Sequence, residues 1–193
     1  MGRPPEFDEA EALERATRVF WQAGYEATSL DDLVEATGVG RQSLYNRFGD
    51  KRGLFLRCLR RYADGFEARL RALLEQERPV SRAFGLLFES VLEEPDEHKR
   101  MGCLLVNTAM ELARSDVEVG DLIARNQRVL EALFTEALQA GKARGELPRG
   151  VQPAALARFL LGTLLGLTVL QKSDPRSEAP RDMVRVALRS LTP

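Results

Sequence analysis

The chain has 193 residues, of which 44% are hydrophobic and 30% charged, and its formal net charge is -1 at pH 7. This length is enough to bury a substantial core, and the composition excludes the low-apolar, highly charged pattern of a disordered chain. The balanced charge excludes no class of partner, because acidic residues elsewhere can cancel a basic patch. With only Cys58 and Cys103, and no apolar leader after Met1, we expect a reduced, cytoplasmic protein.

The first two helices are predicted from their caps and their periodicity. Asp8 can cap a helix whose apolar residues recur at helical spacing, and Gly24 can end it. Ser29, followed three residues later by Asp32, resembles a capping box with Asp in place of the usual Glu or Gln. A second, short helix is therefore expected to run from Ser29 to Gly38.

A third short helix and a long fourth one follow. In the segment 41–48, Leu44 and Phe48 lie four residues apart and share a face that is expected to be buried. Asp50 can cap the next helix, whose apolar stripe continues to about Glu75. This helix is long enough to leave the N-terminal unit and enter a second one.

The rest of the chain also reads as helices, and no sustained alternation of period two indicates a strand. Helices are expected at residues 80–92, 103–114, 117–143, 153–172 and 180–191. Segments rich in proline, glycine and charge separate them at residues 93–102, 145–150 and 173–179. The predicted fold is all-α, with a small N-terminal three-helix unit followed by a larger helical body.

The longest apolar run, residues 154–170, contains Arg158, two glycines and two threonines. It is too short and too polar for a membrane span, so a buried or interface helix is expected. No membrane association is predicted.

The local charge changes sign where the second and third helices meet. From Val39 to Arg61 the chain carries seven basic residues against Asp50 alone, an excess that attracts a polyanion. The glycine-containing turn before it matches a helix-turn-helix, which places its second helix in the major groove of DNA. At the start of that helix, Arg41 can pair with guanine and Gln42 with adenine.

The stretch "TSLDDLVEATGVGRQSLYNRFGDKRGLF" and the preceding "ALERATRVFWQAGYEATSL" are similar to the signature of the tetracycline-repressor (TetR/AcrR) family of transcriptional regulators. The resemblance is close over residues 8–58 and extends to the rest only in size and helical layout. It implies a DNA-binding domain at 1–50 and a ligand-binding and dimerisation domain at 51–193. It also implies a homodimeric repressor that binds a palindromic double-stranded operator and is released by a small, largely apolar effector.

The motif and the resemblance together supply the candidate site residues. DNA contacts are expected from Thr28, Ser29, Gly40, Arg41, Gln42, Ser43, Tyr45, Asn46, Arg47 and Lys51. Asn46 and Arg47 depart from the aromatic and histidine residues often found there, which leaves the operator sequence open.

The body supplies two further sets of candidates. Effector contacts are expected from Phe66, Phe88, Cys103, Asn107, Met110, Gln127 and Phe134. Dimer contacts are expected from Phe159, Leu160, Thr163, Leu167, Val184 and Leu188. Gly162 and Gly166, four residues apart, permit a close helix approach, and Cys103 is expected to be a buried structural thiol rather than a sensor.

The sequence offers few of the residues that catalytic and metal sites need. His98 is the only histidine and is expected in an exposed loop, so no catalytic residue, metal ligand or cofactor is predicted. Two other classes of protein stay open: a DNA-binding or architectural protein without an effector, and a small helical enzyme acting on a hydrophobic substrate. Loss of operator binding on addition of a ligand separates a regulator from both.

Overall fold

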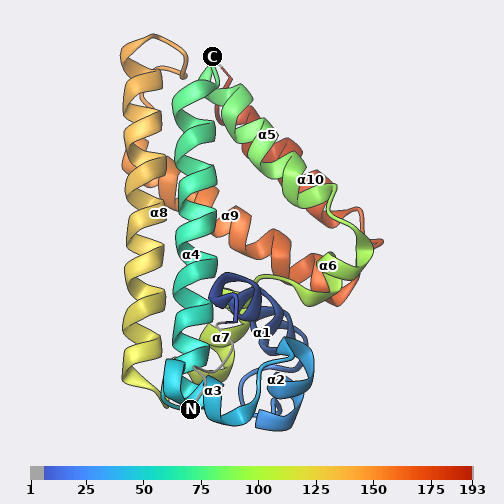
Figure 1. Ribbon diagram of the computed structural model, residues 1–193. Coiled ribbons are helices and arrows are strands. Elements are labelled where there is room, and N and C mark those ends of the chain that lie inside the picture. The colour runs from blue at the N-terminus through green and yellow to red at the C-terminus, as the bar shows by residue number, and fades with distance from the viewer. Residues whose placement is uncertain (1–6, 193) are drawn as a thin grey trace.

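The computed structural model describes residues 7–192; residues 1–6 and 193, the outer ends of the two predicted domains, lie outside the described residues. Every regular element within that range is a helix (Figure 1). The helices are α1 (Glu9–Ala23), α2 (Leu30–Thr37), α3 (Arg41–Phe48), α4 (Lys51–Gln76), α5 (Val80–Leu92), α6 (Asp96–Met101), α7 (Leu104–Leu112), α8 (Val117–Ala143), α9 (Pro153–Ser173) and α10 (Ala179–Arg189). The predicted all-α architecture is confirmed.

The caps of the N-terminal helices form as their sequences predict. Asp8 caps α1 through its side chain, and Asp50 does the same for α4. Ser29 and Asp32 form a reciprocal capping box at the start of α2. Gly38 ends α2 in the left-handed conformation, with φ of 68°, which an L side chain adopts only with strain. Local sequence thus fixes where the short helices begin and end.

The corner between α3 and α4 depends on a second glycine. A Cβ on Gly53 would lie 2.0 Å from the carbonyl oxygen of Phe48, so no larger residue fits without moving the backbone. Because Phe48 is the last residue of α3, this close approach sets the direction of α3 relative to α4.

The segment 93–102, expected to be a connection without regular structure, contains the short helix α6. The prediction of a loop was wrong here because Pro95 serves as the N-cap residue and Gly102 ends the helix, so the breakers flank a helical turn. His98 therefore lies in a helix, although it is exposed as expected, and its ring stacks on Trp21 with centroids 6.2 Å apart.

Two apolar cores are stacked along α4 and α8. The head core comprises buried residues of α1, α2, α3 and α7, with residues 54–63 of α4 and 119–123 of α8. The body core comprises buried residues of α5, α9 and α10, with residues 70–74 of α4 and 130–138 of α8. Figure 1 shows α4 and α8 side by side, with α1, α2, α3 and α7 grouped at one end.

The head core crosses the predicted domain boundary at residue 50. α7 and the first turns of α8 belong by sequence to the larger body, yet Leu104, Leu112 and Val119 are buried in the head core. The N-terminal unit is therefore not an isolated three-helix domain, because its apolar face is completed by the body.

α9 is long and apolar enough to cross a membrane by length and composition. In this fold it packs against α5, α6, α8 and α10. Leu160, Leu164 and Leu167 are buried in the body core, in keeping with the expected core or interface helix.

Candidate functional site

α3 presents one buried and one exposed face. Leu44 and Phe48 are buried in the head core, as their spacing predicts. Arg41, Gln42 and Tyr45 stand on the solvent side, together with Asn46 and Arg47. Gly40 is the exposed N-cap residue, and Ser43 is half-buried. Seven of the ten predicted DNA contacts thus lie within one exposed helix and its cap.

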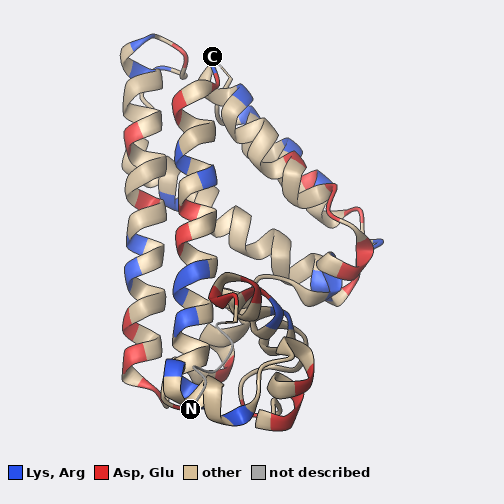
Figure 2. Cartoon of the chain, viewed as in Figure 1, with Lys and Arg blue, Asp and Glu red and all other residues tan. Residues whose placement is uncertain are grey.

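The polar side chains of α3 have partners inside the chain. The guanidinium of Arg41 pairs with the carboxylate of Asp31 at 2.5 Å, and that of Arg47 pairs with Glu9. The Gln42 amide donates to Asn46 at 2.9 Å. Figure 2 shows acidic residues over the surface of α1 and α2 beside α3. Arg41 and Arg47 are therefore held in place by carboxylates before any DNA is bound.

Two of the predicted DNA contacts, Thr28 and Ser29, use their side chains in hydrogen bonds within the chain. The hydroxyl of Thr28 is buried and donates to the carbonyl of Gly24 at 2.6 Å. The hydroxyl of Ser29 donates to the Asp32 carboxylate at 2.7 Å and accepts from the Asp32 N–H. Thr28 thus stabilises the turn before α2, and Ser29 caps the N-terminus of α2.

Lys51, the first residue of α4, lies at the same turn. Its ammonium lies 4.4 Å from the centroid of the Tyr25 ring and 3.5 Å from the carbonyl oxygen of Glu26. Half-buried over an aromatic face, the amine is held where α1 ends and α4 begins.

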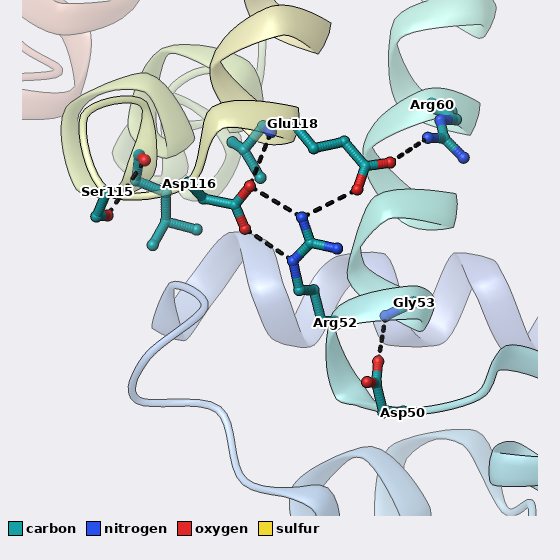
Figure 3. A network of polar contacts seen from close by, with 9 residues as sticks. Asp50, Arg52, Gly53, Arg60, Ser115, Asp116 and Glu118 are labelled. Carbon is teal, nitrogen blue, oxygen red and sulfur yellow. Dashed lines mark hydrogen bonds and ion pairs between the residues drawn. The ribbon is translucent and has the colours of Figure 1, made fainter.

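A network of ion pairs joins the start of α4 to the start of α8 (Figure 3). The guanidinium of Arg52 donates to both carboxylate oxygens of Asp116, at 2.8 and 2.9 Å, and pairs with Glu118 at 3.0 Å. Glu118 also pairs with Arg60 at 2.9 Å. The hydrogen bonds from Arg52 and from the Val119 N–H lower the pKa of Asp116 to about 2.

A carboxylate from α7 holds the turn between α1 and α2. Glu111 accepts the backbone N–H of Tyr25 at 3.1 Å and that of Glu26 at 2.9 Å. Gly24, with φ of 82°, turns the chain so that both N–H groups face this carboxylate. Trp21 adds a third link, because its indole N–H donates to the carbonyl of Gly102 at 3.0 Å. No local pattern signals these contacts, which span more than eighty residues.

A cavity of about 520 Å³ lies between the two cores. Leu105 and Ile123 line it from the head core, and Leu130 and Leu164 line it from the body core. Its size falls within the range of small-molecule pockets, and its walls are largely apolar with a few polar groups, as such pockets require.

The structure brings four of the seven predicted effector residues to this cavity: Phe66, Cys103, Met110 and Gln127. Phe88 and Phe134 are instead fully buried in the body core, where Phe134 packs edge-on against Phe84 at 4.8 Å. Asn107 lies outside the cavity and links Met101 to Lys172. Apolar periodicity finds core residues but cannot separate a cavity wall from solid core.

Cys103 is half-buried beside Tyr62, whose hydroxyl lies 3.8 Å from the sulfur. Burial is the main cause that raises the pKa of Tyr62, and Cys103 adds to it. The other cysteine, Cys58, is buried in the head core, and burial raises the pKa of its thiol to about 11. Within residues 7–192 no cluster of histidine, cysteine or carboxylate side chains can hold a metal ion.

Most of the predicted dimer residues face inward. Leu160, Thr163, Leu167 and Val184 are buried in the chain itself, and Leu188 is partly buried. Only Phe159 is exposed, because the stripe Leu160–Thr163–Leu167 is the face that α9 turns to the body core. The outer faces of α9 and α10 carry Phe159 together with three small or apolar residues outside the predicted set: Gly162, Val169 and Val186.

Two family descriptions match the chain. Residues 12–58 match "Bacterial regulatory proteins, tetR family", and residues 81–188, more than half of the chain, match "Tetracyclin repressor-like, C-terminal domain". The chain belongs to the TetR family of bacterial regulatory proteins. Members are DNA-binding transcriptional regulators with a helix-turn-helix, so the class inferred from the α2–α3 motif is confirmed.

Relatives match over nearly the whole length. The uncharacterized HTH-type transcriptional regulator YezE of Bacillus subtilis is 37% identical, over 99% of this chain and 100% of its own. The HTH-type transcriptional repressor ComR of Escherichia coli is 33% identical, over 97% of this chain and 90% of its own. These TetR-family relatives are described as regulators and not as enzymes.

A solved structure shares the fold. It is a cysteine mutant of the TetR family transcriptional regulator CifR complexed with 26-base-pair double-strand operator DNA. The TM-score is 0.85 at 32% identity, and the match covers 98% of this chain and 100% of that one. The arrangement of helices described here is thus one that occurs in a TetR-family regulator bound to its operator.

Proposed function

We propose that this TetR-family regulator is a cytoplasmic homodimeric repressor. It binds a palindromic operator through α3 of each subunit, and a small molecule in the cavity between the two cores releases it. The observation that carries the proposal is the exposed face of α3, on which Arg41, Gln42 and Tyr45 stand side by side above a fully packed inner face.

DNA reading and DNA anchoring fall to different residues. Arg41 and Gln42, at the N-terminal end of α3, have the side chains and position to contact base edges in the major groove. Tyr45 and Lys51 lie where the sugar-phosphate backbone passes, with Asn46 and Arg47 as further contacts. For Thr28 and Ser29, the side chains are occupied, so they act by shaping the start of α2.

The dimer interface is assigned to the exposed faces of α9 and α10 rather than to their buried stripes. Phe159, Gly162 and Val169 follow one another at helical spacing on the outer side of α9. A Cβ on Gly162 would meet no atom of another helix within 4 Å, so that face is open to a close approach by a second helix. A two-fold pair of subunits matches the symmetry of a palindrome.

Effector control follows from where the cavity lies. α7 lines it through Leu105 and Ala109, and the same helix holds the α1–α2 turn through Glu111. A molecule that binds better to a conformation with α7 displaced lowers operator affinity by the difference in its two affinities.

The test is a gel-shift titration with the DNA upstream of the protein's own coding sequence, repeated with unrelated DNA. Arg41→Ala should lower affinity for the upstream DNA by about tenfold or more and leave binding to unrelated DNA nearly unchanged. Lys51→Ala should weaken binding to both DNAs, since a phosphate contact carries no sequence information. The slope of log affinity against log salt concentration should become shallower by about one.

Glu14→Ala serves as a control, because Glu14 is exposed on α1 and is not one of the predicted DNA contacts. Equal affinity of the wild type for upstream and unrelated DNA would argue against sequence-specific reading at this site. Unchanged binding by both Arg41→Ala and Lys51→Ala would reject α3 and the start of α4 as the contact surface.

A further inference from the structure

The apolar part of the cavity determines what the body of its ligand must be. Phe66 and Leu130 lie on its walls with Leu105 and Leu164. A wall of this kind stabilises a hydrocarbon or aromatic group by removing its apolar surface from water. An apolar wall does not fix the orientation of the ligand, so the orientation must come from polar groups.

Those polar groups gather in one cluster. Arg69 of α4, Glu94, and His98 and Lys99 of α6 all line the cavity. Glu94 lies on the segment that leads into α6, His98 and Lys99 lie within that helix, and Arg69 borders the same cavity from α4. Trp21 stacks on His98 and completes this part of the wall.

Among these four lining residues, two are basic and one is acidic, and Asp96, which pairs with Lys99, does not line the cavity. Arg69 and Lys99 are permanent cations, whereas Glu94 is the one carboxyl among the four. Burial raises the pKa of Glu94, although the three neighbours act in the opposite direction.

Lys99 is the member of the four that is most withdrawn from water. Its side chain is only 15% exposed, and its ion pair with Asp96 is long, at 3.9 Å. An ammonium withdrawn from water without a close partner is costly, and an anion placed beside it recovers part of that cost.

We propose that the effector is an amphipathic organic anion. Its apolar body lies between the two cores, and its carboxylate, or a group of like charge and size, lies at Arg69 and Lys99. This rests on the proposed function for the location of the site, and it adds the chemical class of the ligand.

Three probes with the same ten-carbon chain test the class: decanoate, decanol and decylamine, each kept below its aggregation concentration. Trp21 is the only tryptophan of the chain and lines the cavity, so its fluorescence reports occupancy directly. Titration calorimetry supplies an independent dissociation constant. Decanoate should bind about tenfold or more tightly than decanol, and decylamine should bind most weakly.

Variants locate the charge. Lys99→Met should remove most of the preference for decanoate over decanol. Arg100→Gln, which removes the charge of an exposed residue in the same helix, should leave that preference unchanged. Glu94→Gln should leave decanoate binding as strong or strengthen it. Tighter binding of decylamine than of decanoate, a loss of decanoate binding in Glu94→Gln, or no binding by any probe would overturn the proposal.

The failure of the ligand class can be told from the failure of the proposed function. Probe binding is measured without DNA, and operator binding is measured without probe. Operator binding that survives saturating decanoate would reject decanoate-like anions as effectors while leaving sequence-specific DNA binding intact.

Discussion

The head core and the body core are built from the same two long helices but do different work. The head core seals the reading unit and takes in α7 and the first turns of α8. The body core joins α5, α9 and α10 and leaves an outer face of α9 exposed. The cavity lies between them, with a wall from each.

Under the proposed function, this difference lets a ligand act on a DNA-reading helix that it does not touch. α7 belongs to the head by packing and to the body by sequence, and it forms part of the cavity wall. We propose that a shift of α7 is transmitted through the Glu111 carboxylate, while Arg52 and Asp116 hold the start of α8 to the start of α4. The junction, and not either core alone, is therefore the coupling element that we propose.

The largest expected effects come from damaging each core separately. Phe55 packs against Phe20 and Tyr25 in the head core, and Phe134 packs against Phe84 in the body core. Phe55→Ala and Phe134→Ala should each lower the free energy of unfolding by about 3–5 kcal/mol, as measured by denaturant titration. At temperatures where both variants stay folded, only Phe55→Ala should lose operator binding. Equal loss in both would mean that the cores are not separable.

The outer face of the body core gives the next effect. Gly162→Arg introduces a long charged side chain where the chain itself leaves open space, so the subunit should still fold. Sedimentation should show monomers, and operator affinity should fall by about a hundredfold because the two reading heads are no longer linked. Gly162→Ala is the matched control. A Gly162→Arg variant that remains dimeric would place the interface elsewhere.

A smaller effect is expected at the junction. Glu111→Ala leaves the N–H groups of Tyr25 and Glu26 without their acceptor and should cost about 1–3 kcal/mol of stability. Operator affinity should fall several-fold, and Glu111→Gln, which keeps one acceptor, should lie between Ala and wild type. If all three proteins bind operator alike, the α7 contact does not position the head.

The smallest effect is a pH dependence. The pKa of Asp116 is lowered to about 2 by Arg52, from an ordinary value of 3.8. Its ion pair therefore stabilises the fold above the ordinary value, and this contribution is lost as pH falls through about 2. The free energy of unfolding, measured from neutral to acid pH, should fall less steeply in Asp116→Asn than in the wild type. Parallel curves would show that the pair adds no stability.

The contrast between the regions also explains what sequence could predict. The head follows local rules: Asp8, Ser29 and Asp50 cap their helices, and the spacing of Leu44 and Phe48 predicts the buried face of α3. A helical period of this kind is complete within one or two turns. The all-α fold and the residues of the helix-turn-helix motif can therefore be predicted from the sequence.

The body depends on contacts between distant segments. Periodicity identified Leu160 and Leu167 as an apolar stripe but could not tell whether the partner was α8 or a second subunit. It could not distinguish Phe134, in solid core, from Phe66, on the cavity wall. The Glu111 contact with the Tyr25 N–H was likewise out of reach, because only the fold brings them together.

The central claim is that occupation of the space between the cores weakens operator binding. Ala109 lines the cavity from α7, and Ala109→Trp fills part of it without any ligand. Circular dichroism should show the wild-type helix content, and a gel-shift titration on the upstream DNA should show operator affinity lowered by about tenfold or more, the range of a typical coupling free energy. A folded Ala109→Trp protein that binds the operator as tightly as the wild type would contradict the claim.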